Sequence, residues 1–146
     1  MPVDKKFIGR EYGPLTYEIG KEKIKEYAAG IKNFDPHYLN DEFAKKSKYK
    51  GIIAPPTFAV IYSGMVIAPF FMDPELNLDF AMLVHGEQEF EFYEVVRPND
   101  VITSTGKIVS IENKEKVDVV ALDVLSKNQT GKDVCKATFT FVIRKR

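Results

Sequence analysis

The spacing of apolar residues changes along the chain from a helical period to a two-residue alternation. Ile24, Tyr27, Ala28 and Ile31 fall at positions i, i+3, i+4 and i+7, which predicts an amphipathic helix with Gly20 as a weak N-cap. Residues 16–19 form a short strand candidate before this helix, and residues 41–46 favour a further turn or two of helix that ends by Gly51. The first part of the chain is therefore predicted to be mainly helical.

Residues 57–67 are apolar on nearly every side, which is typical of a buried helix rather than an amphipathic surface helix. Pro55 and Pro56 stand at its entrance, where prolines are tolerated, and Pro69 bounds it downstream. Such a segment needs cover on all sides. We expect a sheet to curl around it.

From Leu83 onward, apolar and polar residues alternate as they do in strands. Phe90, Phe92 and Val95 flank the charged Glu89 and Glu91, and Arg97-Pro-Asn-Asp100 supplies turn chemistry. Three longer runs follow, at residues 101–111, 117–125 and 134–143, separated by polar turn segments. Four or five long antiparallel strands around one central helix give a predicted α+β fold with a strongly curved sheet.

Composition narrows the functional classes. The 146 residues are 45% hydrophobic and 29% charged, which predicts one domain over residues 1–146. Twenty-one basic residues balance twenty-one acidic ones, so bulk charge favours neither nucleic acid nor an acidic membrane surface. The start of the chain lacks an apolar signal core, and Gly64 and Pro69 break the longest apolar run. We therefore expect a cytoplasmic protein with no membrane span.

Metal, disulfide and covalent chemistry find little support in the sequence. Cys135 is the only cysteine, and its alternation with Val134, Ala137 and Phe139 predicts a packing thiol on a strand. The two histidines, His37 and His85, are far apart in sequence and have no clustered acidic partners, so no metal site is expected. No Gly-rich phosphate loop is present, and no cofactor is predicted.

Four segments in a fixed order carry a family resemblance: Tyr27-Ala-Ala-Gly-Ile-Lys-Asn-Phe-Asp-Pro-His-Tyr38, Gly51-Ile-Ile-Ala-Pro-Pro-Thr-Phe58, Leu83-Val-His-Gly-Glu-Gln-Glu-Phe90 and Val96-Arg-Pro-Asn-Asp-Val101. With them the chain resembles the MaoC-like and FAS1-like acyl dehydratases of the hot-dog superfamily, nearly end to end. It is most similar to the substrate-binding subunits of (3R)-hydroxyacyl-carrier-protein dehydratases. The resemblance implies a hot-dog fold, dimers that lay two sheets side by side, and an acyl thioester bound in a tunnel at the subunit boundary.

Active members of this family carry the motif Asp-x-Asn-Pro-x-His. Hydration of a 2-enoyl thioester needs a base to activate water and an acid to protonate the α-carbon, and a carboxylate and an imidazole that share one water serve both needs. In register with the shared proline, this chain has Asn33 for the aspartate, Asp35 for the asparagine and Tyr38 for the histidine. The catalytic pair is therefore absent in register, because an amide is no base and a phenol titrates near pH 10.

The oxyanion donor of the family also differs here. The family places a backbone N–H at the start of the central helix, where the helix dipole assists. This chain has Pro55-Pro56 at that point, and proline has no N–H to give. Thr57 offers the first free amide and a hydroxyl one position later.

These departures favour an acyl-binding subunit of a heterodimeric dehydratase or hydratase, paired with a second hot-dog chain that keeps the aspartate and the histidine. Its ligand would be an acyl-CoA or an acyl-carrier-protein thioester. We expect Phe58, Tyr62 and residues 65–71 to form the channel wall. The substrate-binding residues are predicted to be Asn33, Pro56, Thr57, Phe58, Tyr62 and His85.

Two alternatives remain open. The chain could be a self-sufficient homodimeric hydratase that uses Asp35 and His37 as an acid–base pair with Tyr38 as an assisting acid, or a non-enzymatic acyl-CoA-binding domain. Simpler structural roles also fit these residues: turns and caps for Asn33 and Asp35, a surface position for His37, and packing for Tyr38. Lys45, Lys46, Lys48 and Lys50 form either a solvated face or a dock for phosphates or an acidic carrier protein.

Overall fold

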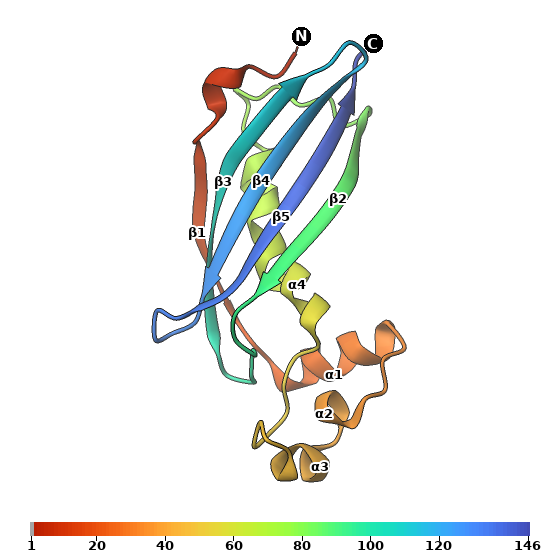
Figure 1. The fold of residues 1–146 in the computed structure, drawn as a ribbon, viewed down its shortest axis with the longest axis vertical. Helices are drawn as coiled ribbons and strands as arrows, with labels where there is room; N and C mark the ends of the chain where they lie inside the picture. Colours follow the sequence, from red (N-terminus) through yellow and green to blue (C-terminus); the bar gives the residue numbers. More distant parts are fainter. Residues whose placement is uncertain (1) are drawn as a thin grey trace.

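A single antiparallel sheet of five strands dominates the computed structural model, which describes residues 2–146 (Figure 1). The spatial order of the strands is β1-β3-β4-β5-β2, so β1 and β2 are the two edges. Their bounds are β1 Glu11–Glu18, β2 Leu83–Phe92, β3 Val101–Asn113, β4 Val117–Lys127 and β5 Asp133–Arg144. The strands predicted after residue 83 are confirmed.

The alternation in sequence becomes two unlike faces of the sheet. In β4, Val120, Leu122 and Val124 are fully buried while the residues between them are half-buried, and β5 repeats this pattern. One face thus packs on the helical layer and the other looks outward. The register β3 to β4 to β5 keeps the buried positions of neighbouring strands in line.

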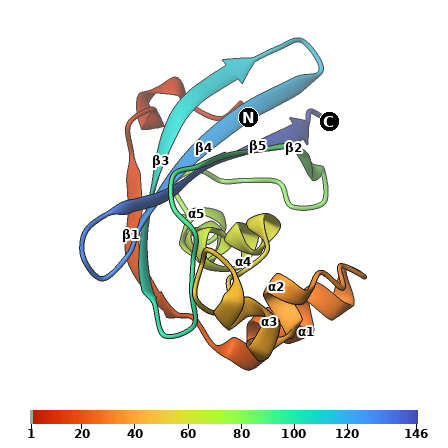
Figure 2. The ribbon, with the colours of Figure 1, turned by 60° about the horizontal axis from the view of Figure 1, so that its bottom comes forward.

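One helical run lies against the concave face of the sheet (Figure 2). It comprises four short pieces: η2 Pro56–Phe58, α4 Ala59–Ser63, η3 Gly64–Val66 and α5 Ile67–Phe71. Phe58, Val66 and Phe70 on it are completely buried, which stabilises the fold by about 1.5–3 kcal/mol for each side chain. A curved sheet around a central helix is the α+β arrangement that the hot-dog resemblance implies, and that prediction is confirmed.

The helical run differs in detail from the predicted helix at residues 57–67. It continues to Phe71, and Pro69 lies inside it rather than beyond it. Pro69 is the third residue of α5, in a first turn where a missing N–H leaves no helical hydrogen bond broken. At η3 the run approaches the sheet closely, so that a Cβ placed on Gly106 of β3 would overlap the Val66 side chain.

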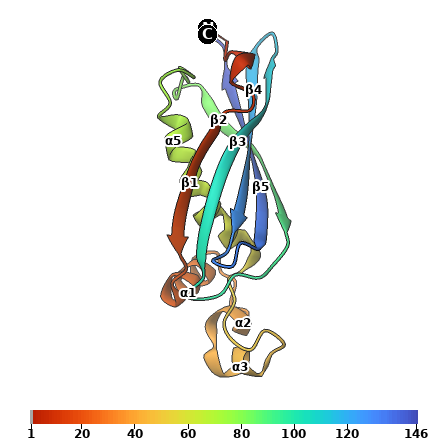
Figure 3. The same ribbon diagram turned by 90° about the vertical axis from the view of Figure 1, so that its left-hand side faces the viewer.

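Three helices form an extension beyond one end of the sheet (Figures 1 and 3). They are α1 Lys21–Gly30, α2 Pro36–Leu39 and α3 Asp41–Lys46. Gly20 is the N-cap of α1, as predicted, and Asn40 caps α3 by accepting a hydrogen bond from the Phe43 amide at 3.0 Å. The sequence reading missed α2, whose single turn starts at Pro36 directly after its cap, Asp35.

No helix within residues 2–146 combines the length and the apolarity that crossing a bilayer requires.

Candidate functional site

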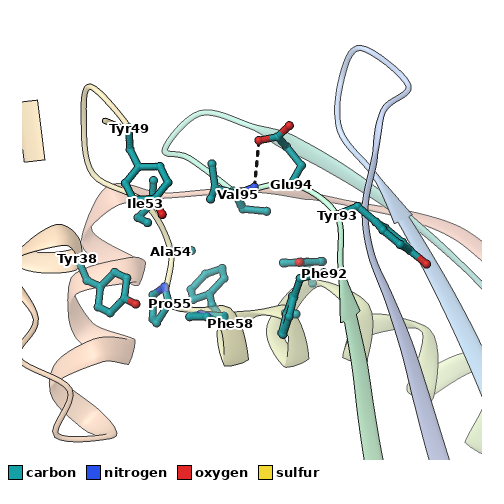
Figure 4. Close-up of a pocket in the computed structure, with 14 residues that line it drawn as sticks. Tyr38, Tyr49, Ile53, Ala54, Pro55, Phe58, Phe92, Tyr93, Glu94 and Val95 are labelled. Atoms are coloured by element: carbon teal, nitrogen blue, oxygen red, sulfur yellow. Dashed lines mark hydrogen bonds between the residues drawn. The ribbon is translucent and has the colours of Figure 1, made fainter. Parts of the chain in front are cut away.

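A cavity of about 400 Å³ opens where the helical run begins (Figure 4). Its walls come from four parts of the chain. Tyr38 of α2 and Tyr49 form one side, and residues 53–56 form the edge next to them. The remaining walls are Phe58, Ala59 and Tyr62 of the helical run and residues 92–96, which begin at the end of β2.

The lining is apolar except for phenol groups and a single carboxylate. Glu94 is the one acidic residue among the lining residues, and its carboxylate accepts hydrogen bonds from the Val95 amide at 3.2 Å and from Lys132 Nζ at 2.5 Å. The Lys132 hydrogen bond holds the pKa of Glu94 below its usual value. Because this carboxylate is ionised and already engaged, it is a poor base for a substrate proton.

Burial raises the pKa of two tyrosines in the cavity wall, and one of them presents its hydroxyl to the cavity. Burial raises the pKa of Tyr38, and Figure 4 shows its hydroxyl pointing toward the cavity beside Pro55. Tyr62 is almost fully buried next to Cys135, and burial raises its pKa as well. Both phenols therefore stay neutral at physiological pH. The Tyr38 hydroxyl is able to donate a hydrogen bond to a thioester oxygen, whereas the Tyr62 side chain is almost fully buried beside Cys135.

Asp35 and His37 form a hydrogen-bonded pair next to this cavity. Asp35 Oδ1 lies 2.9 Å from the His37 amide and 2.7 Å from His37 Nδ1, and these hydrogen bonds, the backbone one above all, lower the pKa of Asp35. The imidazole packs edge-on against Phe43 and Tyr49, with ring centroids 5.0 and 5.8 Å away. Neither member of the pair is among the lining residues, but Tyr49 is, so the pair stands one aromatic ring from the cavity.

Asn33 and Thr57 lie close to the site without lining the cavity. The Asn33 side chain accepts a hydrogen bond from the Asp35 amide at 3.2 Å and so shapes the turn into α2. The Thr57 hydroxyl accepts one from the Tyr27 hydroxyl at 2.9 Å. The Thr57 amide belongs to the first turn of η2, where no intrahelical acceptor exists.

His85 and residues 65–71 are placed elsewhere. The exposed His85 ring stands over Phe139 and Phe141 at the other end of β2, with centroid distances of 5.7 and 5.3 Å. Val66 and Phe70 are buried in the core under the sheet. Of the predicted substrate-binding residues, the structure brings Pro56, Phe58 and Tyr62 together at the cavity.

Sequence reasoning missed about half of the cavity wall. Tyr49, Ile53 and residues 92–96 meet there because the Ala54 amide donates to the Val96 carbonyl at 2.8 Å and the Arg97 guanidinium donates to the Tyr49 carbonyl. These contacts join segments more than forty residues apart in sequence. Their only advance signal is that Ile53 and Val96 belong to the family-like blocks that begin at Gly51 and Val96.

Within residues 2–146, no three His, Cys, Asp or Glu side chains gather closely enough to hold a metal ion.

Comparison with known proteins places the chain in a family. Residues 6–137 match the family described as "FAS1-like, dehydratase domain region". The chain is 38% identical to a UPF0336 protein of Saccharopolyspora erythraea and 37% identical to one of Streptomyces avermitilis. These matches cover 99% of this chain and 93% and 97% of those proteins. The chain therefore belongs to the FAS1-like dehydratase family.

Solved structures agree with this assignment. A chain of the C-terminally truncated HadBC complex, a (3R)-hydroxyacyl-ACP dehydratase from Mycobacterium tuberculosis, superposes with a TM-score of 0.83 at 26% identity, covering 97% of this chain and 99% of that one. The R-hydratase PhaJ1 from Pseudomonas aeruginosa shares the fold, with a TM-score of 0.70 at 19% identity over 95% of this chain and 83% of that one. The hot-dog fold and the dehydratase and hydratase family predicted from the sequence are confirmed.

Proposed function

We propose that this chain is the acyl-binding subunit of an (R)-specific enoyl-thioester hydratase or 3-hydroxyacyl-thioester dehydratase of fatty acid metabolism, acting in the cytoplasm. In this proposal a second hot-dog chain contributes the aspartate and histidine that activate water. The ligand is an acyl thioester of coenzyme A or of a carrier protein, and no cofactor takes part.

The observation that carries the proposal is the chemistry of the cavity wall. A mainly apolar cavity of about 400 Å³ suits an acyl chain, and the phenol of Tyr38 supplies a polar contact. No histidine or aspartate lines it, and its one carboxylate is held by Lys132. Such a wall binds and orients an acyl chain but offers no free acid–base pair of its own.

The similarity to a chain of the HadBC complex supports a partner for this chain. A paired site explains why Asn33 and Tyr38 stand where active members of the family have the aspartate and the histidine. The partner would provide the missing side chains across the subunit boundary.

A second candidate function rests on the Asp35–His37 hydrogen bond of 2.7 Å. A carboxylate that holds one imidazole nitrogen orients the ring and leaves the other nitrogen able to accept a proton from water. In this alternative His37 is the base, Asp35 its positioning residue and Tyr38 an assisting acid, in a homodimer that needs no second kind of chain.

The decisive experiment is hydration of crotonyl-CoA by the purified chain, followed as loss of the enoyl absorbance, alone and after co-expression with a hot-dog chain carrying the intact Asp-x-Asn-Pro-x-His motif. We expect no turnover alone and turnover with the partner. Turnover by the chain alone that His37→Ala abolishes would overturn the subunit proposal in favour of the homodimeric hydratase. Binding of crotonyl-CoA without turnover, both by the chain alone and with the partner, would favour an acyl-CoA-binding domain.

The location of the acyl group is tested separately by narrowing the cavity. Val95 lines it, so Val95→Phe should weaken binding of an acyl-CoA, measured by calorimetry, by about tenfold. The matched control is Val109→Phe, because Val109 is 41% exposed and does not line the cavity. Equal effects of both substitutions would mean that the acyl chain lies elsewhere.

A further inference from the structure

β2 is an edge strand with an open hydrogen-bonding side. Within the described chain it pairs only with β5, from Leu83 to Phe92 with a register shift at Gly86 (Figure 1). An edge of this length presents a row of unpaired N–H and C=O groups and is a template for another strand. It contains no proline and no lysine, which are common protections of such an edge.

The opposite edge is built differently. β1 carries the Gly13-Pro14 pair, and its register shifts between Tyr12 and Leu15. Proline cannot donate to a ladder, and an irregularity in register interrupts regular pairing. β2 also has a register shift, between His85 and Glu87, but it pairs regularly with β5 over the six residues from Glu87 to Phe92. The regular part of β1 is shorter, from Leu15 to Glu18.

Apolar side chains near β2 are exposed in the isolated chain. Val84 is 59% exposed, Phe92 49% and Phe80 51%. Exposed apolar area of this kind indicates a surface that an added chain covers.

Three glutamates line the outward face of the same strand. Glu87, Glu89 and Glu91 stand across from the outward residues Thr140, Thr138 and Lys136 of β5, while Gln88 and Phe90 stand across from the buried Phe139 and Ala137. All three glutamates are exposed. We call them the glutamate stripe. Among the ion pairs of residues 2–146, only one involves the stripe, between Glu91 and Lys136 Nζ at 4.0 Å.

The glutamate stripe works against pairing with a second copy of this chain. Around a two-fold axis, antiparallel pairing centred on Glu89 places Glu89 opposite Glu89 and Glu87 opposite Glu91. A two-residue slip in either direction still sets two glutamates opposite glutamates, because alternate residues share a face. Like charges directly opposite each other destabilise a strand pair.

Dimers that lay two sheets side by side are what the family resemblance implies, and β2 is the open edge for such a contact. We propose that the glutamate stripe on this edge selects the partner: it favours a chain whose facing strand presents lysine or arginine over a second copy of this chain. This inference rests on the proposed function, since it names how the acyl-binding subunit chooses its catalytic partner. Opposite charges in the same three cross-strand positions attract where like charges repel.

The stripe is tested by assembly, without knowing the natural partner. The probe is a variant of this same chain with Glu87→Lys, Glu89→Lys and Glu91→Lys, mixed in equal amounts with the unchanged chain and followed by native mass spectrometry and sedimentation velocity. We expect the mixed dimer to exceed the statistical half of all dimers, and its excess to shrink in about 1 M salt, where the Debye length falls to about 3 Å. Each chain alone should self-associate more weakly.

The second measurement is the homodimer dissociation constant after the charges of the glutamate stripe are removed. Glu87→Gln, Glu89→Gln and Glu91→Gln together should lower the homodimer dissociation constant about tenfold, because three like-charge contacts disappear. The control replaces Glu11, Glu18 and Glu26, which are exposed and lie off this edge, by glutamine, so that net charge changes equally. Circular dichroism verifies that every variant is folded.

A statistical mixture with the lysine variant, or a homodimer whose dissociation constant is the same with and without the stripe, would overturn the inference. These readouts concern assembly alone. If the charge effects appear but hydration with a motif-bearing partner does not, the partner selection stands and the proposed function falls. If hydration appears with a partner whose pairing does not depend on the glutamate stripe, the proposed function stands and the partner selection falls.

Discussion

Gly106 marks the point where the helical run touches the sheet, and replacing it by alanine should loosen that contact. A Cβ at position 106 would overlap Cγ1 of the fully buried Val66, while its distance to Leu122 would be an ordinary 3.6 Å. Overpacking of this kind costs about 1–3 kcal/mol. Alanine also restricts the unfolded chain and thereby stabilises by about 0.4–1 kcal/mol, so we expect Gly106→Ala to lower the free energy of unfolding by about 1–2 kcal/mol.

The same contact predicts a rescue. Val66→Ala alone removes two buried methyl groups and should lower the free energy of unfolding by about 2 kcal/mol, the transfer of two CH₂ equivalents plus a cavity contribution. In the double variant, the alanine methyl at 106 occupies space that Val66 has vacated. The combined loss should therefore be smaller than the sum of the single losses by about 1–2 kcal/mol.

Urea unfolding monitored by circular dichroism measures the free energy of unfolding of the unchanged chain, the two single variants and the double variant, with the slope m compared between them. Gly64→Ala is the matched control, because an added Cβ at Gly64, in the same turn as Val66, meets nothing within 4 Å. Strict additivity of the two substitutions would refute the reasoning. So would a Gly106→Ala variant as stable as the Gly64→Ala control.

Further predictions concern single side chains. Tyr38→Phe should weaken acyl-thioester binding three- to tenfold in calorimetry, since one hydrogen bond is worth about 0.5–1.5 kcal/mol; unchanged affinity would remove Tyr38 from the site. Burial alone would raise the pKa of Asp118, but hydrogen bonds from Asn113 and the Val3 amide lower it. Its ionised form therefore stabilises the fold above its unfolded pKa of about 3.9, and this contribution is lost as pH falls through the folded pKa. Asp118→Asn should flatten the acid limb of stability in urea titrations below about pH 5. The Cys135 thiol is buried and burial raises its pKa to about 11, so it should react with a thiol reagent only in denaturant; fast labelling of the native protein would contradict its position.

Much of the fold could be predicted from periodicity. The strand predicted at residues 117–125 is β4 Val117–Lys127 in the structure, and the predicted polar turn segments lie where strands end. Helix α1 followed from four apolar residues on one face. Local patterns succeed in these places because burial on one side imposes a fixed period on the side chains. They fail at α2, a single turn too short to show any period.

The candidate site was predicted only in part. Pro56, Phe58 and Tyr62 belong to the helical segment that the sequence marks as buried, and they do line the cavity. Tyr49 and Glu94 also line the cavity, but the sequence does not indicate this, because they lie in loops with no repeating pattern. His85 belongs to a family-like block, yet it stands on Phe139 and Phe141 away from the cavity, because strand register rather than block membership fixes its place.

The class of fold, the family resemblance and the loss of the usual aspartate and histidine in register could all be predicted from the sequence, because each depends on residue types at local spacing. The folded chain was needed to show that Tyr38 faces the cavity while the Asp35–His37 pair stands one ring behind it. It was also needed to show that the glutamates of β2 share an open edge. The physical reason is that cavities and edges are made by contacts between distant segments, such as the Ala54 to Val96 hydrogen bond. Those contacts depend on how the whole chain packs, which no local pattern records.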